Sequence, residues 1–104
     1  MSDLQIASEV FEDLAKARTW YALQAEELSP RFSHEFHAGL SKIIAGPLLY
    51  PCVYQQWRRV LLESFPYVIY FRLHREVIFV ALLFHTSRNP KTARRLLRQR
   101  KFEL

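Results

Sequence analysis

Histidines, one cysteine and a set of arginines are the side chains of this chain that could do chemistry. Cys52 is the single cysteine among 104 residues and stands beside Pro51 with no histidine near it in sequence, so we expect a structural thiol and not a nucleophile. His34 and His37 have a spacing that can hold a metal, but no carboxylate or cysteine pattern accompanies them. We therefore expect solvent-facing histidines, no metal site and, because no glycine loop for phosphate is present, no cofactor.

The whole chain has a formal net charge of +5, and the positive residues are concentrated in its last third. The first 30 residues are mainly acidic, with Asp3, Glu9, Glu12, Asp13, Glu26 and Glu27 against Lys16 and Arg18. From Arg88 onward the cations are Lys91, Arg94, Arg95, Arg98, Arg100 and Lys101, opposed by Glu103 alone. A basic region of this kind attracts polyanions, either nucleic acid or an acidic protein, although a solvated helix face has the same composition.

The bulk composition predicts one domain over residues 1–104, with a basic tail from about residue 91. Half of the residues are hydrophobic and only two are glycine, which fits one compact core. A single cysteine suits a reducing compartment, and the first residues carry acids where a signal peptide has basic and then apolar residues. The longest apolar run, residues 77–84, is too short to span a bilayer. We expect a cytoplasmic protein.

Two amphipathic helices are predicted in the first half, after a short strand at residues 4–6. Ser8 caps the first helix, which runs to about Ala25, and Ser29-Pro30 begins the second, which Gly46-Pro47 ends. The apolar stripes are Val10, Leu14, Ala17 and Tyr21 in the first helix and Phe32, Phe36, Leu40 and Ile43 in the second. The short break between them implies an antiparallel helical hairpin.

The second half of the chain is predicted to consist mainly of β-strands. Residues 57–62, 67–73 and 77–84 are rich in β-branched and aromatic side chains, and residues 94–102 form a possible last helix. No helix separates the strands, so the sheet is mostly antiparallel. The predicted fold is α+β: an N-terminal strand and a two-helix hairpin packed on one face of a sheet of about four strands, in the order β-α-α-β-β-β.

Both faces of the predicted sheet are apolar. In the third strand Tyr67, Ile69, Phe71 and Leu73 alternate with Val68 and Tyr70, and in the fourth Val77, Phe79, Ala81 and Leu83 alternate with Ile78, Val80, Leu82 and Phe84. A sheet with one face in water alternates apolar with polar residues instead. The helical hairpin covers one face only. The other is covered either by the C-terminal helix or by a separate protein chain.

Several short motifs occur in a distinctive order. They are Asp13-Leu14 and Trp20-Tyr21, then Pro47 and Pro51, then Arg58-Arg59-Val60-Leu61-Leu62 with Phe65-Pro66-Tyr67-Val68-Ile69-Tyr70, and finally Phe84-His85-Thr86-Ser87-Arg88-Asn89-Pro90. In this order the chain, to about Pro90, resembles RelE/ParE toxins of the plasmid-stabilisation type, whose usual ending is His-x-x-Arg-Asp-Pro.

The resemblance implies the toxin of a bacterial type II toxin–antitoxin system. Its partners would be a cognate antitoxin, whose flexible arm covers the second apolar face, and a target, either DNA gyrase or ribosome-bound messenger RNA. Operator DNA would be bound only through the antitoxin, and no membrane is involved. The residues expected to bind antitoxin or target are Arg59, Val68, Tyr70, Arg72, Arg94, Arg95 and Arg98.

The superfamily contains messenger RNA nucleases and gyrase poisons. In a nuclease, Arg58 or Arg59 together with Arg88 would hold the phosphate and His85 would move the proton. A structural alternative has Arg88 capping strand ends and His85 fixing the turn before Asn89.

Two departures weaken the nuclease interpretation. Val68 stands where many cleaving relatives place an arginine, and no tyrosine follows Tyr70. The His-x-x-Arg-x-Pro ending looks closer to the gyrase-directed branch, so we expect a non-catalytic gyrase poison. The alternatives are a ribosome-dependent messenger RNA endonuclease, or a non-toxic relative that binds nucleic acid through Arg94, Arg95, Arg98 and Arg100.

Overall fold

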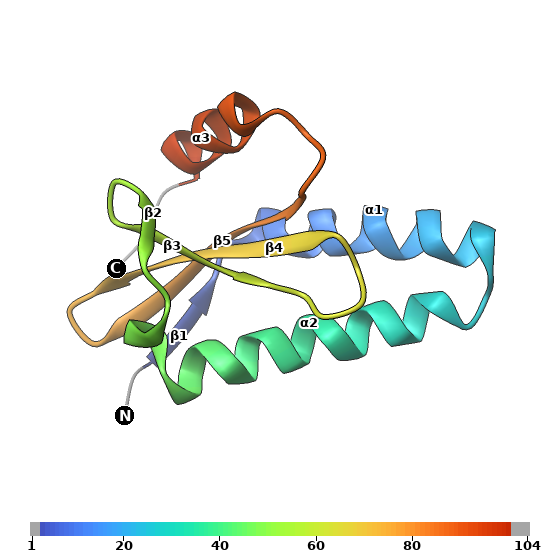
Figure 1. Ribbon diagram of the computed structural model, residues 1–104, viewed down its shortest axis with the longest axis horizontal. Helices are drawn as coiled ribbons and strands as arrows, with labels where there is room; N and C mark the ends of the chain where they lie inside the picture. The colour runs from blue at the N-terminus through green and yellow to red at the C-terminus, as the bar shows by residue number, and fades with distance from the viewer. Residues whose placement is uncertain (1–2, 101–104) are drawn as a thin grey trace.

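The computed structural model describes residues 3–100 and is an α+β fold (Figure 1). Its elements are β1 (Asp3–Ile6), α1 (Ser8–Gln24), α2 (Leu28–Ala45), a 3-10 turn η1 (Pro47–Leu49), β2 (Cys52–Tyr54), β3 (Trp57–Leu61), β4 (Tyr67–His74), β5 (Val77–His85) and α3 (Pro90–Gln99). The helical hairpin and the three predicted strands are confirmed. Within residues 3–100 no helix has the length and apolar content needed to cross a membrane.

The sheet has five strands in the order β1-β5-β4-β3-β2. The pairs β2–β3, β3–β4 and β4–β5 are antiparallel, and β1 joins β5 in parallel, from Asp3 opposite Val77 to Ile6 opposite Val80. The strand β2 was not predicted. It is three residues long, and the turn that joins it to β3 has Gln55 at φ 51° in place of the glycine or asparagine that usually marks such a turn.

Both helix starts differ from the predicted ones. The chain passes directly from β1 into α1, because the Ala7 amide donates to the Val80 carbonyl of the sheet (2.9 Å), and Ala7 takes the capping position without a side-chain cap. The Ser8 hydroxyl instead donates to the Glu9 carboxylate (3.5 Å). In α2 the helix begins at Leu28, so Ser29 lies inside the first turn, where its hydroxyl accepts a bond from Arg18 (3.1 Å).

The helical hairpin, α1 and α2, packs on one face of the sheet (Figure 1). The large buried side chains of this core are Val10, Phe32, Phe36, Ile43, Ile69, Phe71, Ile78 and Val80. Gly39 allows α2 to lie close to the strands, since a Cβ atom there would stand 2.8 Å from Ile69 Cδ1. Close packing of large aromatic and branched residues therefore fixes the hairpin against the sheet.

The second face of the sheet is covered by α3, on the side away from α2 (Figure 1). Ala93 and Leu97 of α3 are buried against a second core made of Trp57, Val68, Tyr70, Phe79, Ala81, Leu82 and Phe84. Of the two coverings left open by the sequence, the C-terminal helix is the one observed. In this structure α3 shields most of the second face from water.

The helix α3 begins earlier than predicted. Asn89 caps it, with its side-chain oxygen accepting from the Lys91 amide (2.9 Å), and Pro90 occupies the first turn, where a missing N–H costs nothing. The predicted helix spans residues 94–102, of which 101–102 lie outside the described residues. Because the helix begins four residues earlier than predicted, only a short loop separates it from β5, and it packs over the sheet.

Alternation along β5 is interrupted at Ala81. Opposite Tyr70 and Phe71 of β4, the register shifts by one residue, so that Ala81 and Leu82 both join the core beneath α3. Leu83 consequently shares the hairpin face with Ile78 and Val80, whereas strict alternation had placed it on the face of Phe79 and Ala81. A β-bulge of this kind adds one residue to a strand and leaves local backbone groups without ladder partners.

Candidate functional site

A cavity of about 650 Å³ lies between α1 and the end of β5; we call it the α1 groove. Its lining residues are Asp13, Lys16, Ala17, Trp20 and Tyr21 of α1, Pro66 and Tyr67 at the start of β4, Leu83 and His85 of β5, and Ser87 and Arg88 of the following loop. Two of the three residues predicted for catalysis, His85 and Arg88, therefore line one cavity.

The groove exists because β1 is shorter than β5. The parallel pair ends with Ile6 opposite Val80, so residues 81–85 of β5 have no strand on that side, and α1 runs there instead. Asp13 of α1 takes the place of a strand by accepting a hydrogen bond from the Leu83 amide (3.2 Å). Ala17, one turn further along α1, is buried and small enough to keep the helix close to the sheet.

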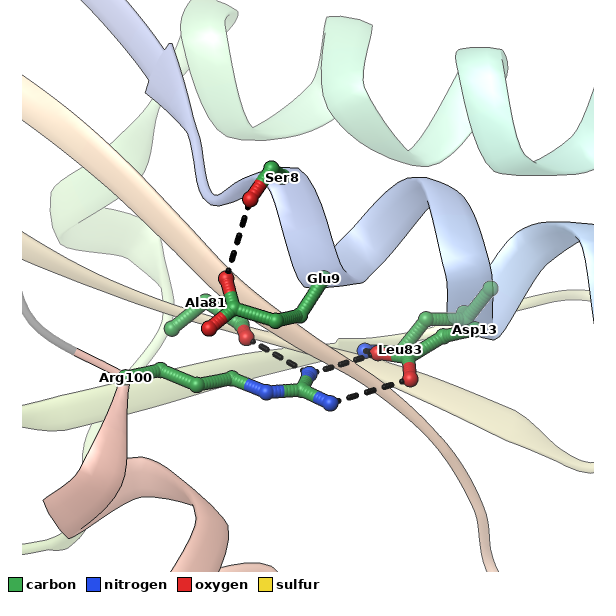
Figure 2. A network of polar contacts seen from close by, with 6 residues as sticks. All are labelled: Ser8, Glu9, Asp13, Ala81, Leu83 and Arg100. Carbon is green, nitrogen blue, oxygen red and sulfur yellow. Dashed lines mark hydrogen bonds and ion pairs between the residues drawn. The ribbon is translucent and has the colours of Figure 1, made fainter.

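Asp13 is also held by an arginine from the far end of the described chain (Figure 2). Arg100 donates from Nη1 to Asp13 Oδ2 (2.6 Å) and from Nη2 to Asp13 Oδ1 (3.1 Å), and Nη1 also reaches the Ala81 carbonyl (3.0 Å). The pair therefore satisfies the Ala81 and Leu83 backbone groups beside the bulge. With both carboxylate oxygens engaged, Asp13 is a structural residue of the groove wall.

His85 is tied into the loop that follows it. Its Nδ1 accepts the Ser87 backbone amide (3.0 Å) and lies 2.8 Å from the Ser87 hydroxyl, while its ring stands edge-to-face on Tyr67 at 5.0 Å. A ring nitrogen that accepts a backbone N–H carries no proton, so the neutral ring has its proton on Nε2. In this arrangement His85 can donate a hydrogen bond from Nε2, but the lone pair of Nδ1 already accepts the Ser87 amide.

Arg88 is exposed and is positioned by an aromatic ring. Its guanidinium carbon lies 4.6 Å from the centre of the buried Phe84 ring, and its backbone amide donates to the His85 carbonyl (3.1 Å). Stacking on a ring holds a guanidinium in place while leaving its donors available. Together with Lys16, Arg88 gives the groove two cations that could hold an anionic group.

Tyr67 lies between these cations and the core. Burial raises the pKa of its phenol, the neighbouring Tyr21 raises it further, and Arg88 opposes the shift in part. Tyr67 therefore stays neutral at physiological pH and serves as a hydrogen-bonding and packing group.

Arg58 lies away from the groove. It is on β3 opposite Phe71, on the sheet face that carries the helical hairpin, and its guanidinium donates to the Tyr50 carbonyl. It does not line the α1 groove. The three residues that the sequence suggested for phosphate binding and proton transfer are thus not brought together.

A second set of predicted residues gathers on the other side of the molecule, in two neighbouring cavities between α3 and strands β2–β4. Arg59, Tyr70 and Arg94 line one of about 150 Å³, and Arg72 and Arg98 line the other, of about 340 Å³. Tyr54 connects them, since Arg94 lies 5.2 Å from its ring centre and Arg98 donates to its hydroxyl (3.2 Å). We call these two cavities the arginine furrow.

Of the predicted binding residues, Val68 and Arg95 do not line the furrow, and Tyr70 is a largely buried part of its wall. Val68 is only 1% exposed and is packed beneath α3, so a partner cannot reach it while α3 is in place. Tyr70 is 8% exposed and contributes to the furrow wall. Arg95 is exposed on α3.

Sequence reasoning missed the aromatic and basic residues of α1 that build the groove. Trp20 is 58% exposed and Leu23 is 79% exposed, and both line a shallow apolar hollow beside the groove with Lys16. Trp20 falls off the apolar stripe of α1, and a large aromatic residue at such a position was the available signal.

The described residues offer little other reactive chemistry. Over residues 3–100 no three His, Cys, Asp or Glu side chains form a group that could hold a metal ion. Cys52 is a free, exposed thiol, and His34 and His37 are both exposed on α2.

Comparison with known proteins gives no family assignment. Neither a scan against protein-family models nor a search of curated proteins finds a match to this chain.

Proposed function

We propose that this chain is the toxin of a bacterial type II toxin–antitoxin system and that it acts in the cytoplasm by binding DNA gyrase. Support begins with the sequence motifs that resemble RelE/ParE toxins. The order of a strand, a helical hairpin and a mostly antiparallel sheet, which that resemblance implies, is the order of this fold. One fold can serve many functions, so the proposal depends on the chemistry of the α1 groove.

The single observation that carries the proposal is that the α1 groove holds cations and aromatic rings but no side chain ready to act as a base. Among its described lining residues, Asp13 is occupied by Arg100, the His85 lone pair is occupied by Ser87, and Tyr67 is held neutral. RNA cleavage by its own 2′-hydroxyl needs a group that removes a proton. This groove is suited to binding, and a poison needs only to bind.

The apolar rim favours a protein as the bound target. Trp20 and Leu23 expose large apolar surfaces next to Lys16, and interfaces between proteins combine such anchors with cations. We assign the groove to gyrase, with Arg88 and Lys16 contacting acidic groups of the bound protein. The antitoxin would cover the same groove, because α3 already occupies the face that the sequence had assigned to it.

The test uses purified gyrase and purified ribosomes side by side. The wild-type chain should increase the amount of cleaved DNA held by gyrase and leave messenger RNA on ribosomes intact. Arg88→Ala should lower the gyrase effect by roughly tenfold or more, as removal of a central interface arginine does. Arg31→Ala, which removes an exposed arginine of α2 outside the groove, is the matched control and should act like the wild type.

Cutting of messenger RNA on ribosomes that Arg88→Ala abolishes would overturn the gyrase proposal and make the chain a nuclease. Equal activity of Arg88→Ala and wild type on gyrase would show that the groove is not the contact surface. Normal growth of bacteria that express the chain alone would refute the toxin assignment itself.

A further inference from the structure

We propose that the arginine furrow, together with the outer face of α3, binds the phosphate backbone of nucleic acid without reading its base sequence. This site is separate from the α1 groove and does not depend on gyrase being the target. The first observation is the charge of the furrow: its lining residues within the described part of the chain include Arg59, Arg72, Arg94, Arg98 and Arg100 but no aspartate or glutamate.

Most charges of the furrow are not neutralised elsewhere in the described part of the chain. Over residues 3–100 the ion pairs within 4.0 Å are Lys42–Glu63 and Asp13–Arg100. Arg100, which also lines the furrow, is therefore neutralised, whereas Arg59, Arg72, Arg94 and Arg98 take part in neither pair. Like charges around one furrow repel one another, and a bound anion would relieve that repulsion. The furrow is thus built to receive negative charge.

The helix α3 extends this positive surface. It contains no acidic residue, and its exposed positions add Lys91 and Arg95 to Arg94 and Arg98. At a rise of about 1.5 Å per residue, the stripe from Lys91 to Arg98 is about 10 Å long, enough to follow two or three successive phosphates of one strand. A line of cations matches a line of phosphates better than it matches a single anion.

Aromatic rings hold the furrow arginines in place before any ligand arrives. Arg94 and Arg98 both contact Tyr54, and Arg72 lies 5.6 Å from the centre of the Trp57 ring. Arg72 Nε is buried and has no hydrogen-bond partner. A positioned guanidinium loses little freedom when it binds a ligand.

The chemistry of the surface favours nucleic acid over an acidic protein. Protein interfaces have an apolar centre, whereas the exposed residues of α3 are Pro90, Lys91, Arg94, Arg95, Arg98 and Gln99. Stacking on bases has no support either, because Trp57 is buried and arginines lie over the rings of Trp57 and Tyr54. Contacts therefore go to phosphate, which every sequence shares.

The experiment measures binding of the purified chain to a fluorescent DNA duplex of about 20 base pairs and mixed sequence over a range of salt concentrations. Wild-type affinity should fall steeply with salt and should not depend on the duplex sequence. Arg94→Ala should weaken binding about three- to tenfold and lower the salt dependence by about one unit of slope, while Arg31→Ala, which removes the same charge from α2, should change binding little. Arg94→Glu should weaken it further.

Binding measurements with other nucleic acids and with an acidic peptide distinguish the possible ligands. A single-stranded DNA and an RNA duplex of the same length should bind within severalfold of the DNA duplex, since all present the same backbone. Equal losses in Arg94→Ala and Arg31→Ala would overturn the proposal, because net charge and not the furrow would then be responsible. Tighter binding to an acidic peptide of equal charge would also overturn it. Arg88→Ala should retain full DNA binding, so failure of the gyrase proposal leaves this one standing.

Discussion

At the scale of single residues, the ion pair between Asp13 and Arg100 joins three parts of the fold. Its side chains are mostly shielded from water, and it connects α1, the bulge of β5 and the residue that follows α3 (Figure 2). Because Ala81 and Leu83 lie where no strand continues the sheet, their backbone groups depend on this pair for hydrogen bonds. An exposed ion pair contributes little to stability, but this pair also completes the sheet edge.

Replacing Asp13 with asparagine should lower the free energy of unfolding by about 2–3 kcal/mol, since the Arg100 guanidinium then loses its carboxylate in a shielded site. Urea unfolding followed by circular dichroism measures the change. The control is Glu12→Gln, which neutralises the preceding, exposed acid of α1 and should change stability by less than about 0.5 kcal/mol. Equal effects of the two substitutions would contradict a special role for Asp13.

Tyr67 provides a prediction about pH. Its pKa is raised above the ordinary value of 10.0 by burial, so the fold prefers the neutral phenol. The stability that it contributes is fully present below the unfolded pKa and is lost as pH rises through the higher folded pKa. Burial also raises the pKa of Tyr21, so the ultraviolet absorbance of tyrosinate should show a phase above the ordinary range that Tyr67→Phe reduces but does not remove. If Tyr67→Phe instead removed absorbance change from the ordinary pH range of tyrosine titration, the buried position of Tyr67 would be contradicted.

At the scale of elements, α3 decides whether the second apolar face meets water. It is a ten-residue helix with a strongly basic outer side, and its buried contacts come mainly from Ala93 and Leu97. A helix this short is marginal by itself, so packing on the sheet keeps it folded. The same element thus covers the core with one side and presents the arginine furrow and its cations with the other.

Leu97→Ala should lower the free energy of unfolding by about 2–4 kcal/mol, because it removes the central apolar contact of α3 and leaves a cavity. The variant should also bind hydrophobic dyes more strongly as α3 detaches from Val68 and Tyr70. Leu61→Ala, at an exposed leucine of β3, is the control and should cost less than about 1 kcal/mol. Unchanged dye binding in Leu97→Ala would show that α3 is not the cover of this face.

At the scale of the whole molecule, periodicity was sufficient to predict the helical hairpin and the three long strands. Their signals are local, since apolar residues recur every three or four positions in α1 and α2 and form short β-branched runs in β3, β4 and β5. Asn89 and Pro90 carried the start signals of α3, but they had been assigned to a motif and not to a helix. The predicted start of the helix, residue 94, therefore lies four residues after the observed start at Pro90.

The features that the sequence did not predict depend on contacts between distant residues. The bulge at Ala81 leaves no mark in composition, and the partners Asp13 and Arg100 are 87 positions apart. The same difference between local and long-range features applies to the candidate sites. His85 and Arg88 were predicted together because they are neighbours in sequence, whereas the separation of Arg58 from them is decided by which side of the sheet each residue takes.

The parallel pairing of β1 with β5 has a consequence for how the protein is made. The first strand emerges from the ribosome long before its partner, since Asp3 lies opposite Val77, and the helical hairpin has no complete sheet to pack on until then. Closing such long loops is slow, and the exposed apolar strands are prone to aggregate in the meantime. Until Arg100 has been synthesised, the nascent polypeptide lacks the ion pair that completes the sheet edge, so folding of this domain is a late event that chaperones have time to influence.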